Sequence, residues 1–240
     1  IKTHPIAALL LDMGLGKTVI TLTAIRDLML DTCEVNKVLV IAPLRVARDT
    51  WPAEVEKWDH LKDMDVSVIV GTQKERLAAI NHNALIYVIN RENVKFLVEH
   101  YEKNGMHWDF DCIVIDELSS FKNHQSQRFK WLRKVRPFVK RWIGLTGTPT
   151  SNGLMDLWAE IGILDGGERL GRFIGRYREA YFKAGSMNPQ TGVVFQYVPR
   201  PGAEEQIYER ISDITISMKA MDYLKMPDCI YTQHLSLIHI

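Results

Sequence analysis

The chain has 240 residues, 46% of them hydrophobic and 25% charged, with a formal net charge of +1. This composition is ordinary for a globular protein, and so small a net charge neither favours nor excludes a nucleic-acid partner. No stretch approaches the roughly 18 consecutive apolar residues of a membrane span, so we expect no membrane association. The three cysteines are widely separated and lack CxxC spacing, which predicts a reduced, cytoplasmic chain without a zinc site or disulfide framework.

Short apolar runs alternate with longer amphipathic stretches over about the first 150 residues, the pattern of a parallel sheet flanked by helices. The runs are rich in Val, Ile and Leu with little alternation, as expected for strands buried on both faces. The predicted strands span residues 7–11, 38–41, 66–70, 85–89, 112–115 and 142–145, and the predicted helices span 17–30, 46–58, 74–80, 93–102 and 125–134.

The strand signal fades after residue 149. We predict helices over 154–164 and 173–182, a small hairpin strand over 193–198, and a further helix from Ala203. The expected organisation is an α/β lobe over residues 1–150 followed by a helical extension over 151–234.

A phosphate-loop pattern, LDMGLGKT at residues 11–18, lies between the first predicted strand and the first predicted helix. Glycines allow backbone N–H groups to close around phosphate oxygens, while Lys17 places a positive charge against the outer phosphates. Thr18 offers a hydroxyl to Mg²⁺, so we expect ATP and Mg²⁺ as ligands. Leu11 stands where the general pattern has its first glycine, and the alternative is a plain turn with a surface lysine. The candidate loop residues are Met13, Gly14, Leu15, Gly16, Lys17 and Thr18.

Two adjacent carboxylates, Asp116 and Glu117, end the predicted strand over 112–115. The carboxyl ends of strands form the edge at which open α/β sheets bind ligands. We expect Asp116 to hold Mg²⁺ through water and Glu117 to polarise the attacking water. Solvated turn residues are the alternative interpretation of such a pair.

A third motif, LTGTP at residues 145–149, follows the predicted strand over 142–145, and Thr146 is its candidate catalytic residue. The order LDMGLGKT, DELS, LTGTP resembles superfamily-two helicases, specifically the Swi/Snf-type DNA translocases. The resemblance implies a RecA-like P-loop lobe that hydrolyses ATP, tracks along double-stranded DNA and works with a second RecA-like lobe. A strand-separating DNA or RNA helicase, or an ATP-gated nucleic-acid-binding module, remains an alternative.

Further segments at residues 41–58, 88–97, 119–132, 148–167 and 216–228 extend the resemblance over nearly all of 7–228. The resemblance implies that loops at the strand ends contact the backbone phosphates of the nucleic acid. The candidate nucleic-acid contacts are Pro43, Arg45, Asn90, Arg91, Ser151 and Asn152.

Two positions depart from the family pattern. Ser119 stands where many relatives have a histidine or a second aspartate, so no imidazole links the acidic pair to LTGTP. Residues 216–218 read ISM where relatives usually have paired arginines. This compact form looks more like translocases of phages and mobile elements than chromatin remodellers, which implies a bacterial or phage-infected cell.

A basic cluster over residues 128–141 contains no acidic residue and has interleaved aromatics. We interpret it as a solvated helix face with Phe129 and either Trp131 or Leu132 turned to the core. Phosphate contact is the alternative. The cluster comprises Arg128, Lys130, Arg133, Lys134, Arg136, Lys140 and Arg141.

Both ends of the sequence suggest a fragment. There is no initiating Met, and residues 235–240 read LSLIHI, the in-frame translation of CTGTCTCTTATACACATC, a transposon end used in preparing sequencing libraries. We therefore expect residues 235–240 to be a non-native tail and the second RecA-like lobe to be absent. The fragment alone should bind Mg·ATP weakly and hydrolyse it negligibly, because the second lobe supplies arginines that stabilise the transferred phosphoryl group.

Overall fold

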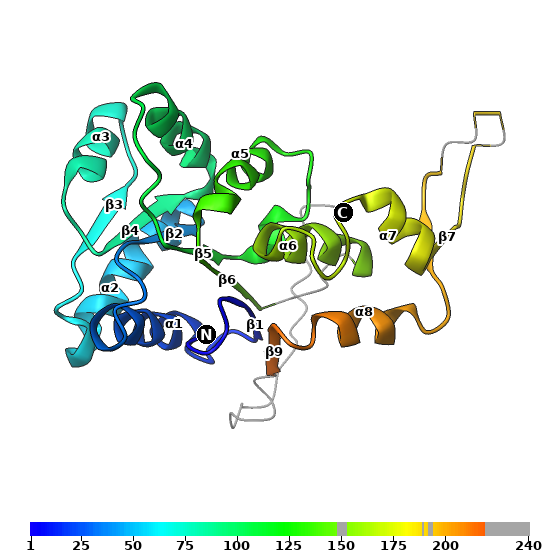
Figure 1. Ribbon diagram of the computed structural model, residues 1–240, viewed down its shortest axis with the longest axis horizontal. Coiled ribbons are helices and arrows are strands. Elements are labelled where there is room, and N and C mark those ends of the chain that lie inside the picture. Colours follow the sequence, from blue (N-terminus) through cyan, green and yellow to red (C-terminus); the bar gives the residue numbers. More distant parts are fainter. Residues whose placement is uncertain (148–152, 189, 192–193, 219–240) are drawn as a thin grey trace, which may run out of the picture.

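A parallel β-sheet forms the centre of the molecule in the computed structural model, which describes residues 1–147, 153–188, 190–191 and 194–218 (Figure 1). Within these residues, seven strands follow the order β3-β4-β2-β5-β6-β1-β9, and every neighbouring pair is parallel. The strands are β1 (Ile6–Leu11), β2 (Val38–Ala42), β3 (Val66–Ile69), β4 (Ile86–Asn90), β5 (Cys112–Asp116), β6 (Arg141–Thr146) and β9 (Thr215–Met218).

The first six strands agree with the sequence prediction to within one residue at either end. The seventh strand, β9, was not predicted. It is only four residues long, and its side chains are exposed or half-buried, so it lacks the apolar run that identified the others. It pairs with β1, with Leu9 opposite Ile216, and so extends the sheet on the side of the phosphate loop.

Helices cover both faces of the sheet (Figure 1). Helices α1 (Lys17–Arg26) and α2 (Trp51–Lys57) pack on one face, and successive strand residues alternate between the two cores: Val40 faces these helices whereas Ile41 faces away. This alternation explains the unbroken apolar runs. The opposite face carries α3 (Gln73–Asn81), α4 (Val94–Lys103), α5 (Gln127–Val135) and α6 (Leu154–Asp165).

The helices that follow residue 153 share the core of the preceding lobe. Trp158 of α6, Tyr177 of α7 (Ile174–Tyr181) and Ile207 of α8 (Ala203–Ile211) belong to the same buried cluster as Ile41. A hairpin is present as the antiparallel strands β7 (Phe182–Ala184) and β8 (Tyr197–Pro199), which extend from the body of the molecule in Figure 1. Strand β8 overlaps only the end of the predicted strand over 193–198, and residue 193 lies outside the described residues. No helix of the described part is long and apolar enough to cross a membrane.

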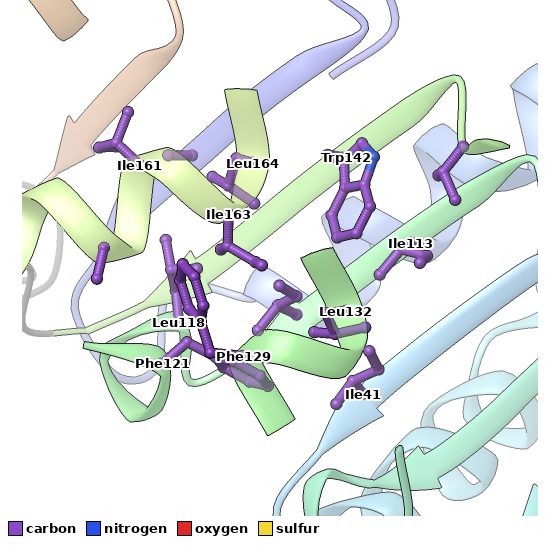
Figure 2. Packing of buried hydrophobic residues seen from close by; sticks show 14 of the residues in the cluster. Ile41, Ile113, Leu118, Phe121, Phe129, Leu132, Trp142, Ile161, Ile163 and Leu164 are labelled. Carbon is purple, nitrogen blue, oxygen red and sulfur yellow. The ribbon is translucent and has the colours of Figure 1, made fainter. Parts of the chain in front are cut away.

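A close approach at Gly144 of β6 fixes α6 and the 3₁₀ turn Leu118–Phe121 on the sheet. Figure 2 shows the side chains of Leu118, Phe121 and Phe129 gathered in one cluster with those of Ile163 and Leu164. A Cβ atom at Gly144 would lie 2.7 Å from Leu118 Cδ2 and 3.0 Å from Leu164 Cδ1. The glycine therefore holds the turn that follows the acidic pair against the sheet.

We predict that Gly144→Ala lowers the free energy of unfolding by about 1–3 kcal/mol, because the added methyl overpacks this contact. Urea denaturation followed by circular dichroism measures the change. Gly175→Ala in α7 is the matched control, since a Cβ there meets no atom within 4 Å. Equal stability of the two variants would show that Gly144 is not a packing constraint.

Candidate functional site at the carboxyl edge of the sheet

The parallel register brings three sequence motifs to one edge of the sheet. Leu10 of β1 lies opposite Thr146 of β6, and Leu145 lies opposite Asp116 of β5. The phosphate loop, the acidic pair and the start of LTGTP leave their strands at this edge. It is the edge at which open α/β sheets bind ligands.

The phosphate loop turns sharply between β1 and α1. Gly14 and Gly16 have φ angles of 84° and 69°, a left-handed conformation that favours glycine. Lys17 begins α1, and its side chain folds back over the loop. Lys17 Nζ donates hydrogen bonds to Leu11 O at 2.6 Å and Asp12 O at 3.1 Å. The loop therefore holds an ammonium group at the N-terminus of a helix, a combination that attracts phosphate.

Gly147 brings the third motif against the phosphate loop. A Cβ atom at Gly147 would lie 3.6 Å from Leu11 O and 3.8 Å from Lys17 Nζ. The neighbouring Thr146 is fully buried. Thr148, Pro149, Ser151 and Asn152 lie outside the described residues. The contact thus joins the ends of β1 and β6 directly beside the lysine.

Asp116 receives a hydrogen bond that the sequence did not reveal. Trp51 Nε1 of α2 donates to Asp116 Oδ2 at 3.0 Å, and the Trp51 side chain is fully buried. Burial raises the pKa of Asp116 above its ordinary value, and the negative charge of Glu117 acts in the same direction, whereas the Trp51 hydrogen bond opposes the shift. The indole N–H fixes one oxygen of the Asp116 carboxylate, and a backbone hydrogen bond from Glu117 also favours the charged form.

Glu117 adopts a conformation that is costly for a residue with a side chain. Its φ and ψ angles are 60° and 62° in the left-handed region. Such a conformation costs on the order of 1–3 kcal/mol and is found preferentially at functional sites. Ser119 Oγ donates to Glu117 Oε2 at 3.3 Å, so the serine that departs from the family pattern contacts the acidic pair itself.

An open groove of about 500 Å³ connects the loop with one of the two acids. Glu117 lies on its lining together with Lys17 and Thr18. The far side is formed by Glu54, Lys57 and Trp58 at the end of α2, none of which was predicted as a site residue. The remaining lining comes from Met13, Gly14, Gly16 and Val19.

This donor set fits a magnesium-bound nucleoside triphosphate. Lys17 and the loop amides are phosphate donors, and Thr18 and Asp116 carry the hard oxygen atoms that Mg²⁺ prefers. No group of three or more His, Cys, Asp or Glu side chains suited to holding a metal ion occurs within the described ranges. A metal ion held here would therefore need oxygen atoms of the nucleotide or of water.

Those predicted nucleic-acid contacts that fall within the described residues lie on the same edge but differ in accessibility. Pro43 and Arg45 follow β2, and Arg45 is exposed. Arg91 follows β4 and is half-buried. Asn90 is buried, with its amide donating to Glu92 Oε2 at 2.9 Å, so its placement favours a structural role over direct contact.

The basic cluster over residues 128–141 is largely a solvated face, as interpreted from the sequence. Phe129 and Leu132 are buried, and Trp131 is half-buried. Several cations of the cluster have acidic partners: Lys134 pairs with Glu102 at 3.1 Å, Lys140 pairs with Asp111 at 2.9 Å, and Arg141 pairs with Glu34.

A buried carboxyl group, Glu160 of α6, lies behind the acidic pair. The residue is only 1% exposed. One turn earlier, Asp156 pairs with Lys122 at 3.7 Å. Burial raises the pKa of Glu160 to about 8, and the charges of Asp156 and Glu117 add to the shift while Lys122 opposes it. Glu160 is therefore mainly protonated in the folded chain at neutral pH.

Sequence comparison identifies relatives of known families. A model of the SNF2-related domain matches residues 4–166. Protein p41 of Acyrthosiphon pisum secondary endosymbiont phage 1 is 39% identical over 225 residues, which cover 91% of this chain and 48% of p41. The chain thus spans about half the length of that relative. The chromodomain-helicase-DNA-binding protein 3 homolog of Caenorhabditis elegans is 32% identical over 167 residues, 61% of this chain and 9% of that protein.

Comparison with solved structures gives the same fold. The SWI2/SNF2 ATPase core of Sulfolobus solfataricus, solved in complex with dsDNA, superposes with a TM-score of 0.66. The match covers 90% of this chain and 40% of that chain at 24% sequence identity. The predicted RecA-like α/β fold is confirmed.

We predict that Glu160→Gln changes how stability depends on pH. Because the pKa of Glu160 is higher in the folded than in the unfolded chain, the folded chain keeps a proton that the unfolded chain releases. The stabilisation that this proton contributes is fully present at pH values below the ordinary pKa of a glutamate. It is lost as the pH rises to about 8. Relative to Glu160→Gln, the wild type should lose up to roughly 1.4 kcal/mol per pH unit in this window.

Urea denaturation at pH 5.5, 7 and 8.5 measures this difference. Glu56→Gln is the matched control because Glu56 is an exposed residue of α2. Parallel pH profiles for the wild type and Glu160→Gln would contradict the prediction.

Proposed function

We propose that this chain, which belongs to the SNF2-related domain family, is the ATP-binding lobe of a nucleic-acid-dependent ATPase that translocates on double-stranded DNA. The observation that carries the proposal is the convergence of Lys17, Glu117 and Gly147 at one edge of the sheet. These residues come from three separate motifs. Lys17 and Glu117 line one groove, with phosphate donors and a carboxylate facing it, and Gly147 lies beside Lys17.

In the proposed mechanism, Lys17 gives up its hydrogen bonds to Leu11 O and Asp12 O. It donates instead to oxygen atoms of the outer phosphates. The amides of the loop and the N-terminus of α1 bind the same phosphates. Thr18 and Asp116 would hold Mg²⁺, and the ion would supply positive charge that stabilises the phosphates. Trp51 keeps Asp116 in position through its indole N–H.

Glu117 orients the attacking water in this mechanism. Its left-handed backbone and the hydrogen bond from Ser119 restrict the direction of the carboxylate. A carboxylate on the groove lining can accept a proton from water as the water attacks the γ-phosphorus and the bond from that phosphorus to the bridging oxygen breaks, releasing ADP. The backbone strain is then part of the preorganisation of the site.

DNA is the proposed polymer because the similar Sulfolobus core was solved with dsDNA and the matching Caenorhabditis elegans protein is named as DNA-binding. Arg45 and Arg91 lie at the carboxyl edge, where they can contact backbone phosphates. Contacts of this kind carry no base specificity, which suits a motor that steps along any sequence. The relationship to phage protein p41 supports a phage or bacterial setting.

We further propose that turnover requires a second RecA-like lobe. In P-loop enzymes an arginine that stabilises the transferred phosphoryl group contributes about 10³–10⁵ in rate. The groove beside Lys17 is open, so a second lobe can complete it.

We predict that this chain binds Mg·ATP but hydrolyses it negligibly, and that Lys17→Ala weakens binding about 10- to 100-fold, the effect of losing a charged hydrogen-bond donor. Isothermal titration calorimetry and phosphate release measure the two quantities. Lys103→Ala, an exposed lysine of α4, is the matched control. Unchanged affinity in Lys17→Ala would refute the nucleotide site. Robust hydrolysis that depends on Lys17 would refute the need for a second lobe.

A further inference from the structure

A second pocket, of about 340 Å³, lies where the end of β4 meets the beginning of α5. Three cationic side chains, Arg91, Lys95 and Arg128, line it together with one carboxylate, Glu92. The pocket is separate from the nucleotide groove and shares no lining residue with it. Its remaining lining comes from Ser126 and Gln127 at the start of α5.

Arg128 differs from the other cations of this pocket. Arg91 pairs with Glu92 at 2.9 Å and Lys95 pairs with Glu99 at 3.5 Å. The Arg128 guanidinium instead lies 5.6 Å from the centre of the Phe121 ring. Its Nε atom is buried and donates no hydrogen bond to any residue in the described part of the chain. Unlike Arg91 and Lys95, Arg128 forms no ion pair with an acidic residue in the described part of the chain, so its guanidinium is available to an anion.

The electrostatics of the pocket favour an anion. Burial lowers the pKa of Arg128, and the positive charge of Arg91 lowers it further, so two like charges are held near each other. The lining carries a net positive charge, because it has three cations and a single carboxylate, Glu92. An anion between Arg91 and Arg128 would relieve this repulsion.

The first turn of α5 adds donors to the same place. Ser126 caps the helix, with its Oγ accepting from Phe129 N at 3.4 Å. The first N–H groups of a helix have no intrahelical acceptors, and this turn contains no acidic side chain to neutralise the helix dipole. Figure 2 shows Phe121 and Phe129 packed together, so the 3₁₀ turn and α5 hold Arg128 on a rigid base.

We propose that this pocket binds a backbone phosphate of duplex DNA, with Arg128 as the principal contact and Arg91 and the start of α5 as supporting donors. The inference rests on the proposed DNA function. It assigns a DNA contact to one member of the basic cluster over residues 128–141, whose other members form a solvated face. β4 is the direct neighbour of β2, whose end carries Arg45, so both arginine sites lie along one edge of the sheet. A guanidinium is suited to this task because its planar fork matches a phosphate with two hydrogen bonds.

The test measures binding of a fluorescent mixed-sequence duplex to the chain at several NaCl concentrations. Arg128→Gln should weaken binding about 3- to 10-fold at low salt and reduce the slope of log K against log[NaCl] by about 0.9, the value for one phosphate contact. Arg128→Lys should keep the slope because it keeps the charge. Arg133→Gln is the matched control, since Arg133 is an exposed arginine on the same helix.

The outcomes separate this inference from the proposed function. If the wild type binds the duplex and Arg128→Gln binds it with the same affinity and slope, the pocket assignment is wrong while the DNA function stands. If the wild type binds Mg·ATP but no duplex, the DNA function itself fails and the pocket assignment falls with it. Inorganic phosphate binding that is lost in Arg128→Gln, with an unchanged duplex slope, would identify a free-phosphate site and also overturn the assignment. Unchanged Mg·ATP affinity in Arg128→Gln verifies that the variant is folded.

Discussion

The parallel register of β5, β6 and β1 is the constraint on which the rest of the site depends. It sets Asp116 opposite Leu145 and Leu10 opposite Thr146, so the loops that follow these strands leave the sheet side by side. The two buried layers maintain this register because each strand contributes alternate residues to each layer. A slip in any of the three strands would separate the lysine from the acids.

Interactions local in sequence were predictable and long-range ones were not. The phosphate loop and the acidic pair were recognisable because each follows an apolar strand and has a distinctive local pattern. Trp51 was missed because it reaches Asp116 across 65 residues, and nothing in the sequence around either residue marks the contact. The role of Glu160 depends on burial by α6 packing, and strand β9 has too few apolar residues to be noticed.

Polar groups of the site are held in arrangements that favour ligand binding at some cost to the stability of the folded chain. Glu117 has a strained backbone. Lys17 is satisfied by backbone carbonyls, an arrangement that a phosphate can replace. Ser119, which departs from the family pattern, donates a hydrogen bond to Glu117. Backbone strain of this kind is characteristic of functional sites.

The most direct test of the nucleotide site is a crystal structure of this chain with Mg²⁺ and a non-hydrolysable ATP analogue. We expect the Lys17 ammonium to leave Leu11 O and Asp12 O and to contact the outer phosphates, with the metal ion beside Thr18 and Asp116. Phosphates bound away from the loop, or an unmoved Lys17 in a nucleotide-bound chain, would contradict the account.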